Sequence, residues 1–104
     1  PAFNLSAKYI IHTVCPRYIY GTAEEKHGLA MAYRSALLFK DKAPDASSIA
    51  FVSLGTGVYR WPLEVAAKIA VTELSKSEFE STMMCVADEI ARAKYNIAYK
   101  TRLL

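Results

Sequence analysis

Three short apolar runs along the chain predict buried β-strands. The first, KYIIHTV at Lys8–Val14, is rich in β-branched and aromatic residues and stops just before Pro16. The second is SIAFVS at Ser48–Ser53, and the third is TMMCV at Thr82–Val86. Continuous runs without strict alternation of apolar and polar positions are typical of parallel strands that are covered on both faces.

Two segments that follow the first and second runs carry the signals of helices. Thr22 and Glu25 form a capping box, which predicts a helix that starts there and extends to about Lys40. Pro62 suits the first turn of a second helix, since its fixed backbone angle is already helical. Alanine and leucine at helical spacing over residues 63–74 give this second helix an apolar face.

The last helix is expected from about Ile90 to Thr101. Its apolar spacing predicts that Ile90, Ala93 and Ile97 face the core. The order of elements is therefore βαβαβα, and right-handed crossovers between such units give a mainly parallel sheet with helices on its faces. The 104 residues are expected to form one α/β domain over residues 1–104.

Composition and charge exclude several classes of function. Charged residues interrupt the apolar runs, so no segment is expected to span a bilayer. The net charge is +3, but the basic residues are scattered and form no stripe for nucleic acid. Cys15, Cys85, His12 and His27 lack the spacing of metal ligands, and we expect no metal and no cofactor. The start of the sequence has no signal-peptide pattern, and reduced cysteines predict a cytoplasmic protein.

The segment SLGTGVY at Ser53–Tyr59 is the candidate for binding chemistry. It joins the end of the second predicted strand to a helix, and open α/β sheets bind ligands at such strand ends. Two glycines, Gly55 and Gly57, allow backbone N–H groups to converge on an anion without any cationic side chain. The alternative is a tight turn that needs glycine only for its geometry. A GxG pattern alone does not separate the two.

Three blocks of sequence resemble the macro domain. They are KYIIHTVCP at Lys8–Pro16, AYRSAL at Ala32–Leu37 and SIAFVSLGTGVYRWPLEVAAKIAV at Ser48–Val71. Macro domains bind ADP-ribose and its relatives, and some hydrolyse ADP-ribosyl esters, O-acetyl-ADP-ribose or ADP-ribose phosphate. The resemblance therefore implies a ligand-binding site in the loop after the second strand.

The resemblance also implies a role for each residue of this loop. Tyr59 would pack beside the distal ribose, and Ser53 would shape the start of the loop. His12 corresponds to a strand histidine that is usually structural, so it receives no catalytic role. The backbone N–H groups implied for the diphosphate and distal ribose are those of Gly55, Thr56, Gly57 and Val58.

The chain resembles only the later part of the family pattern. An Asn-Ala-Asn-type motif and a GGGV-type loop belong to the early part of macro domains, and neither occurs here. In the family's sheet, a strand from that early part lies between the strands that match Lys8–Val14 and Ser48–Ser53. We therefore expect a truncated, three-layer macro-like domain. Its unpaired strand edges predict self-association, with a symmetric dimer as the simplest form.

Three functions follow from this sequence. The first is a weak binding module for ADP-ribose or a related nucleotide diphosphate, with no catalytic residues. The second is a non-enzymatic, self-associating interaction protein that has lost its ligand site. The third is a hydrolase of ADP-ribosyl compounds, which requires an upstream segment with the missing motifs. Neither a GxSxG motif nor a cysteine paired with a base supports a nucleophilic mechanism.

Overall fold

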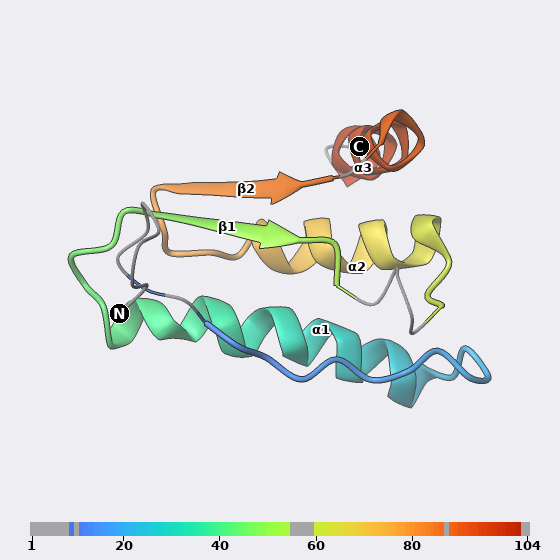
Figure 1. The fold of residues 1–104 in the computed structure, drawn as a ribbon, viewed down its shortest axis with the longest axis horizontal. Coiled ribbons are helices and arrows are strands. Elements are labelled where there is room, and N and C mark those ends of the chain that lie inside the picture. Colours follow the sequence, from blue (N-terminus) through green and yellow to red (C-terminus); the bar gives the residue numbers. More distant parts are fainter. Residues whose placement is uncertain (1–8, 10, 55–59, 87, 103–104) are drawn as a thin grey trace.

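The computed structural model of the chain describes residue 9 and residues 11–54, 60–86 and 88–102. The helices are α1 (Ala23–Leu37), α2 (Leu63–Leu74) and α3 (Glu89–Arg102), with a short 3-10 helix, η1 (Leu38–Asp41), after α1. The strands are β1 (Ser48–Val52) and β2 (Ser81–Cys85). In Figure 1, α1 and α2 pack together below the two strands, and α3 follows the carboxyl end of β2. None of the helices in the described ranges is long and apolar enough to cross a membrane.

The two strands pair in parallel and confirm the second and third predicted runs to within one residue. The register runs from Ser48 opposite Ser81 to Val52 opposite Cys85. Phe51 is buried, and Ile49 is half-buried on the same face. Because alternate residues of a strand point to opposite faces, this face is the one that packs on the helices. The mixed α/β class and the parallel sheet are thus as predicted.

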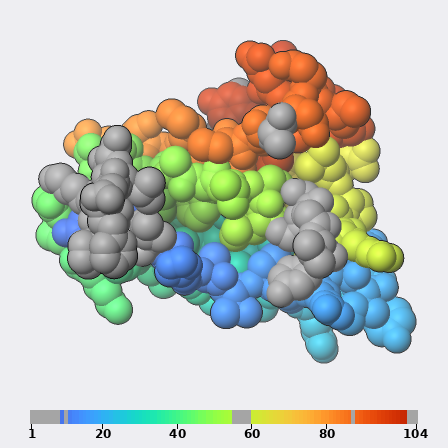
Figure 2. Space-filling model, viewed as in Figure 1, coloured from blue at the N-terminus to red at the C-terminus, as the bar shows by residue number. Residues whose placement is uncertain are grey.

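The other face of the sheet is exposed, so the expectation of cover on both faces is wrong for the described residues. Val52 is 66% exposed and Met83 is 59% exposed, and Ala50 and Cys85 lie on the same face. The space-filling view shows atoms of β1 at the surface between the N-terminal segment and the β2–α3 region (Figure 2). The composition predicted apolar strands. A strand is covered on both faces only where helices pack on each face of the sheet, and the described residues place no helix on the face that bears Val52 and Met83.

The predicted strand at Lys8–Val14 is wrong where the structure describes it. Lys8 and Ile10 lie outside the described residues, and residues 11–18 form neither a helix nor a strand. This segment runs along α1, as the blue ribbon in Figure 1 shows, and the Thr13 hydroxyl donates to the Ala32 carbonyl at 3.1 Å. A strand requires a partner strand for its N–H and C=O groups. Within the described ranges the only strand pair is β1 with β2.

The start of α1 confirms the predicted capping box. The Thr22 hydroxyl accepts from the Glu25 N–H, and the Glu25 carboxylate accepts from the backbone N–H of Thr22. The same carboxylate also accepts from the Gly21 N–H at 2.6 Å. Gly21 has a φ of +70°, and an added Cβ would lie 2.6 Å from the Tyr18 hydroxyl, so glycine suits this turn. The local sequence thus fixes where α1 begins.

Helix α3 forms as predicted, but with a different buried face. Ile90 and Ile97 are 70% and 61% exposed, and Ala93 is also exposed. Tyr95 and Ala91 are buried instead. Apolar residues occur around most of this helix, so periodicity alone did not identify the face that packs. The contact with α2 selects the face that carries Tyr95.

An ion pair between a partly exposed arginine and a buried glutamate joins α1 to α2. The guanidinium of Arg34 on α1 contacts the Glu73 carboxylate of α2 at 3.0 and 3.2 Å, and the Glu73 side chain is only 6% exposed. Burial raises the pKa of Glu73, but the bonds and charge of Arg34 and the charge of Lys76 outweigh it, so the net pKa is lowered. The pair therefore stabilises the α1–α2 contact when Glu73 is ionised.

We predict that Glu73→Gln makes the protein less stable at neutral pH and less sensitive to acid. Because the folded-state pKa is lowered, the ion pair contributes fully well above about pH 4.3, the ordinary value for glutamate. Its contribution is lost as the pH falls from there through the lowered pKa. The variant should lose about 1–2 kcal/mol at pH 7 and less than that at pH 3. Denaturant unfolding at both pH values tests this, with the exposed Glu78→Gln as the control. Equal losses at both pH values would contradict it.

Candidate functional site

The predicted binding loop lies between β1 and α2. Ser53 and Leu54 follow the last residue of β1, and Arg60 to Pro62 precede α2. Gly55, Thr56, Gly57, Val58 and Tyr59 lie outside the described residues, so Ser53 is the predicted site residue whose surroundings are known. The loop leaves the sheet at the carboxyl end of β1. In parallel sheets this is the end where ligands bind.

Two tyrosine hydroxyls hold the chain where it leaves β1. The Leu54 N–H donates to the hydroxyl of Tyr33 on α1 at 3.0 Å. The hydroxyls of Ser53 and of Tyr95 on α3 lie 2.5 Å apart, and either can be the donor. Tyr33 is 0% exposed and Tyr95 is 7% exposed. Ser53 and Leu54, the first two residues of the Ser53–Tyr59 loop, are therefore held by side chains from two different helices.

Both tyrosines are kept neutral by their surroundings. Burial raises the pKa of Tyr33, and the neighbouring Tyr95 raises it further. Burial also raises the pKa of Tyr95, although its bond with the Ser53 hydroxyl and the nearby Tyr33 act in the opposite direction. A hydroxyl with a raised pKa acts as a hydrogen-bonding group rather than as a base at neutral pH. Their part in the site is therefore structural support and not proton transfer.

Neither tyrosine contact was predicted from the sequence. Tyr33 lies in the AYRSAL block and Tyr95 in α3, and neither was given a polar role. A tyrosine at a core position still needs a hydrogen-bond partner for its hydroxyl, so each buried tyrosine indicated that such a contact exists. The partners are 21 and 42 residues away along the chain, so this indication could not identify them.

The far end of the loop is also tied to the body of the protein. The Trp61 indole N–H donates to the Pro16 carbonyl at 2.8 Å, and the rings of Tyr18 and Trp61 meet edge to face at 5.1 Å. Arg60 has a φ of 63°, a left-handed conformation that costs energy in a residue other than glycine. These contacts place the segment before α1 against the end of the loop.

Other candidate groups near the site fit structural roles. Asp88 precedes α3 and accepts from the Ala91 N–H at 2.8 Å, as a residue that caps the start of a helix does. Cys15 is half-buried, and burial raises the pKa of its thiol, which opposes use as a nucleophile. Among the described residues, no group of three or more histidine, cysteine or acidic side chains can hold a metal.

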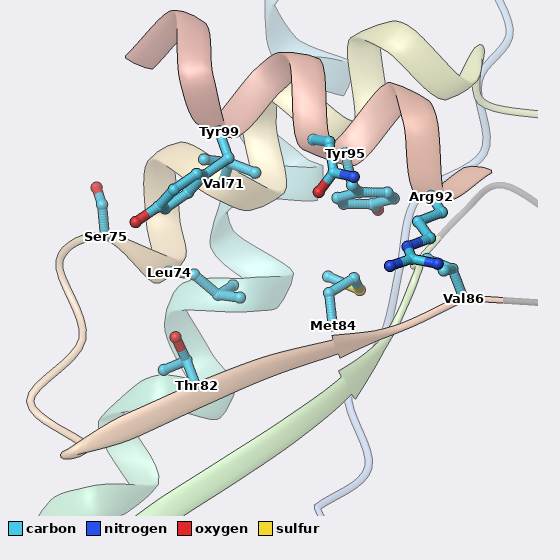
Figure 3. Close-up of a pocket in the computed structure, with 10 residues that line it drawn as sticks. Val71, Leu74, Ser75, Thr82, Met84, Val86, Arg92, Tyr95 and Tyr99 are labelled. Carbon is cyan, nitrogen blue, oxygen red and sulfur yellow. The ribbon is translucent and has the colours of Figure 1, made fainter. Parts of the chain in front are cut away.

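Two cavities flank the sheet. One, of about 390 Å³, lies between α2, β2 and α3. Tyr95 and Arg92 of α3 lie on its Met84 side, while Tyr99 points toward Ser75 (Figure 3). The other, of about 580 Å³, lies between the segment containing Ile11 and Thr13 and strand β1. Tyr95 therefore borders the first cavity while its hydroxyl bonds to Ser53. The second cavity separates the segment containing Ile11 and Thr13 from strand β1.

A comparison with protein families identifies the family to which the chain belongs. The Macro domain family matches residues 1–70, and the chain belongs to the macro domain family. An uncharacterized protein of Fusobacterium nucleatum, FN1951, is 40% identical over 107 residues, which cover 97% of this chain and 60% of that protein. The O-acetyl-ADP-ribose deacetylase of Salmonella typhimurium is 45% identical over 75 residues, which cover 72% of this chain and 41% of that enzyme.

Solved structures agree with this assignment. The Oceanobacillus iheyensis macrodomain with ADP superposes with a TM-score of 0.79 at 29% identity, covering 88% of this chain and 50% of that chain. A mutant of the same macrodomain with ADPR gives a TM-score of 0.80 at 29% identity, covering 88% of this chain and 51% of that chain. The chain thus spans about half the length of these macrodomains.

We predict that Trp61→Phe destabilises the protein by about 1–3 kcal/mol, because the Pro16 carbonyl loses its donor and part of a buried ring is removed. Thermal unfolding followed by far-UV circular dichroism measures the effect. The control Tyr18→Leu removes only the ring contact and should cost less. A larger loss in Tyr18→Leu than in Trp61→Phe would show that the indole N–H contributes little.

Proposed function

We propose that the chain binds ADP-ribose, or a related nucleotide diphosphate, through the loop Ser53–Tyr59. The observation that carries the proposal is the fixed start of this loop, where Leu54 and Ser53 are bonded to Tyr33 and Tyr95 at the carboxyl end of β1. Membership of the macro domain family supports the ligand class, as do the Oceanobacillus iheyensis macrodomain structures with ADP and with ADPR.

In this proposal, main-chain donors bind the diphosphate. Tyr59 packs beside the distal ribose, and Ser53 sets the direction of the loop. Backbone N–H groups suit a chain with a net charge of only +3 and no basic run, because they supply positive potential without cationic side chains. The proposed N–H donors are Gly55, Thr56, Gly57 and Val58.

We infer weak binding for this chain, because the Ser53–Tyr59 loop alone supplies few contacts to a ligand. Hydrolysis also needs a water and a distal-ribose contact placed together, and loss of such placement is costly. The free Cys15 and Cys85 fit a reducing compartment, and a cytoplasmic location is part of the proposal.

Calorimetry with ADP-ribose tests the proposed site. We expect a dissociation constant on the order of 0.1–1 mM, which corresponds to about 4–5.5 kcal/mol of binding free energy. Gly57→Glu places a carboxylate where the diphosphate is expected, and should weaken binding at least about tenfold. Ser35→Glu adds the same charge on the exposed face of α1 and should leave the affinity unchanged. Absence of heat at millimolar ADP-ribose would end the proposal.

A second candidate function is self-association through the sheet. The observation that favours it is the exposed face bearing Ala50, Val52, Met83 and Cys85, next to a β1 edge without a neighbouring strand in the described ranges. Exposed apolar faces and open strand edges promote contact with another chain. We propose that a second copy of the chain covers this face in a symmetric homodimer.

Light scattering coupled to gel filtration tests the dimer. The expected mass is twice the 11.6 kDa of the monomer at high concentration. Val52→Lys puts a charge on the exposed sheet face and should raise the dimer dissociation constant at least about tenfold. Ile97→Lys makes a matched change on the outer face of α3, where Ile97 is 61% exposed, and should have no such effect. A wild-type monomer at every concentration contradicts this function, and dissociation by Ile97→Lys alone contradicts the sheet interface.

A further inference from the structure

Side chains from two different helices reach the point where β1 ends. Tyr33 comes from α1, below the strands in Figure 1, and Tyr95 comes from α3, above them. Their hydroxyls bond to Leu54 and Ser53, which are adjacent residues. The direction in which the chain leaves β1 is therefore set by both helices together.

The hydroxyl groups are not needed for the packing of these two rings. The Tyr33 ring packs on Phe51 with ring centroids 5.2 Å apart, and Tyr95 belongs to the same core cluster. Phenylalanine could fill both positions at lower cost, because a buried hydroxyl must first lose its water. The hydroxyls offset this cost only through the bonds that they make.

The two bonds complement each other chemically. The Tyr33 hydroxyl accepts the Leu54 N–H at 3.0 Å. The Tyr95 hydroxyl pairs with the Ser53 hydroxyl at 2.5 Å. One bond therefore holds the backbone and the other holds a side chain at the start of the loop.

We propose that Tyr33 and Tyr95 are positioning residues for the ligand site. They act through Leu54 and Ser53 and orient the start of the Ser53–Tyr59 loop, so that the affinity for the diphosphate depends on their hydroxyls. This inference rests on the proposed function for the ligand. The fixing of the loop start is a separate statement that can be tested without ligand.

The variants are Tyr33→Phe and Tyr95→Phe, which keep the rings and remove only the hydroxyls. The matched control is Tyr20→Phe, because the Tyr20 side chain is 84% exposed. ADP-ribose affinity is measured by calorimetry at a temperature where all variants are folded. Amide hydrogen exchange of Leu54 and its neighbours is measured without ligand.

We expect each phenylalanine variant to weaken ADP-ribose about two- to tenfold, as the loss of one hydrogen bond allows. Exchange at Leu54 should rise about tenfold or more in Tyr33→Phe, while exchange within α2 stays at the wild-type rate. Tyr20→Phe should change neither. A loss of stability alone would raise exchange throughout the protein, so the local pattern separates positioning from general destabilisation.

A double-mutant cycle tests the Tyr95 contact. Ser53→Ala and Tyr95→Phe remove the same bond, so their combination should weaken ADP-ribose no more than either change alone. Full additivity overturns the Tyr95 part of the proposal. Unchanged Leu54 exchange in Tyr33→Phe overturns the Tyr33 part. If wild type fails to bind ADP-ribose while local exchange still rises, the proposed ligand is wrong and the fixing of the loop start stands.

Discussion

The contact between Tyr33 of α1 and Phe51 of β1, with ring centroids 5.2 Å apart, joins helix α1 to the sheet. Phe51 is the buried residue of β1, and Tyr33 is fully enclosed beneath it. Each aromatic side chain buries a large apolar area, so this pair contributes strongly to the small core. The same Tyr33 also bonds to Leu54 through its hydroxyl. Tyr33 therefore contributes both to the packing of the core and to holding Leu54 at the start of the loop.

Much of the fold could be predicted because its signals are local. The capping box of Thr22 and Glu25 fixed the start of α1, since both partners lie within one helical turn. The second and third strands were found from short apolar runs, and they pair in parallel in the register from Ser48–Ser81 to Val52–Cys85. The position of the glycine loop between β1 and α2 followed from these boundaries.

The errors share one physical cause, which is that they concern contacts between distant segments. The run Lys8–Val14 has strand composition, but a strand forms only beside a partner, and residues 11–14 instead lie along α1. The buried face of α3 was misassigned because Ile90 and Ile97 are as apolar as the residues that pack. In both cases the tertiary context overrode a correct local preference.

The contacts of the candidate site are also made between distant segments of the chain. Sequence predicted the loop and Ser53 but not Tyr33 or Tyr95, whose partners are remote along the chain. A binding site built largely from one loop makes few contacts, so a larger share of its binding energy is spent on ordering that loop. Hydrogen bonds that fix Ser53 and Leu54 in advance reduce this ordering cost. For the proposed ADP-ribose site, we therefore expect the buried tyrosines to influence affinity more than any single additional contact to the ligand.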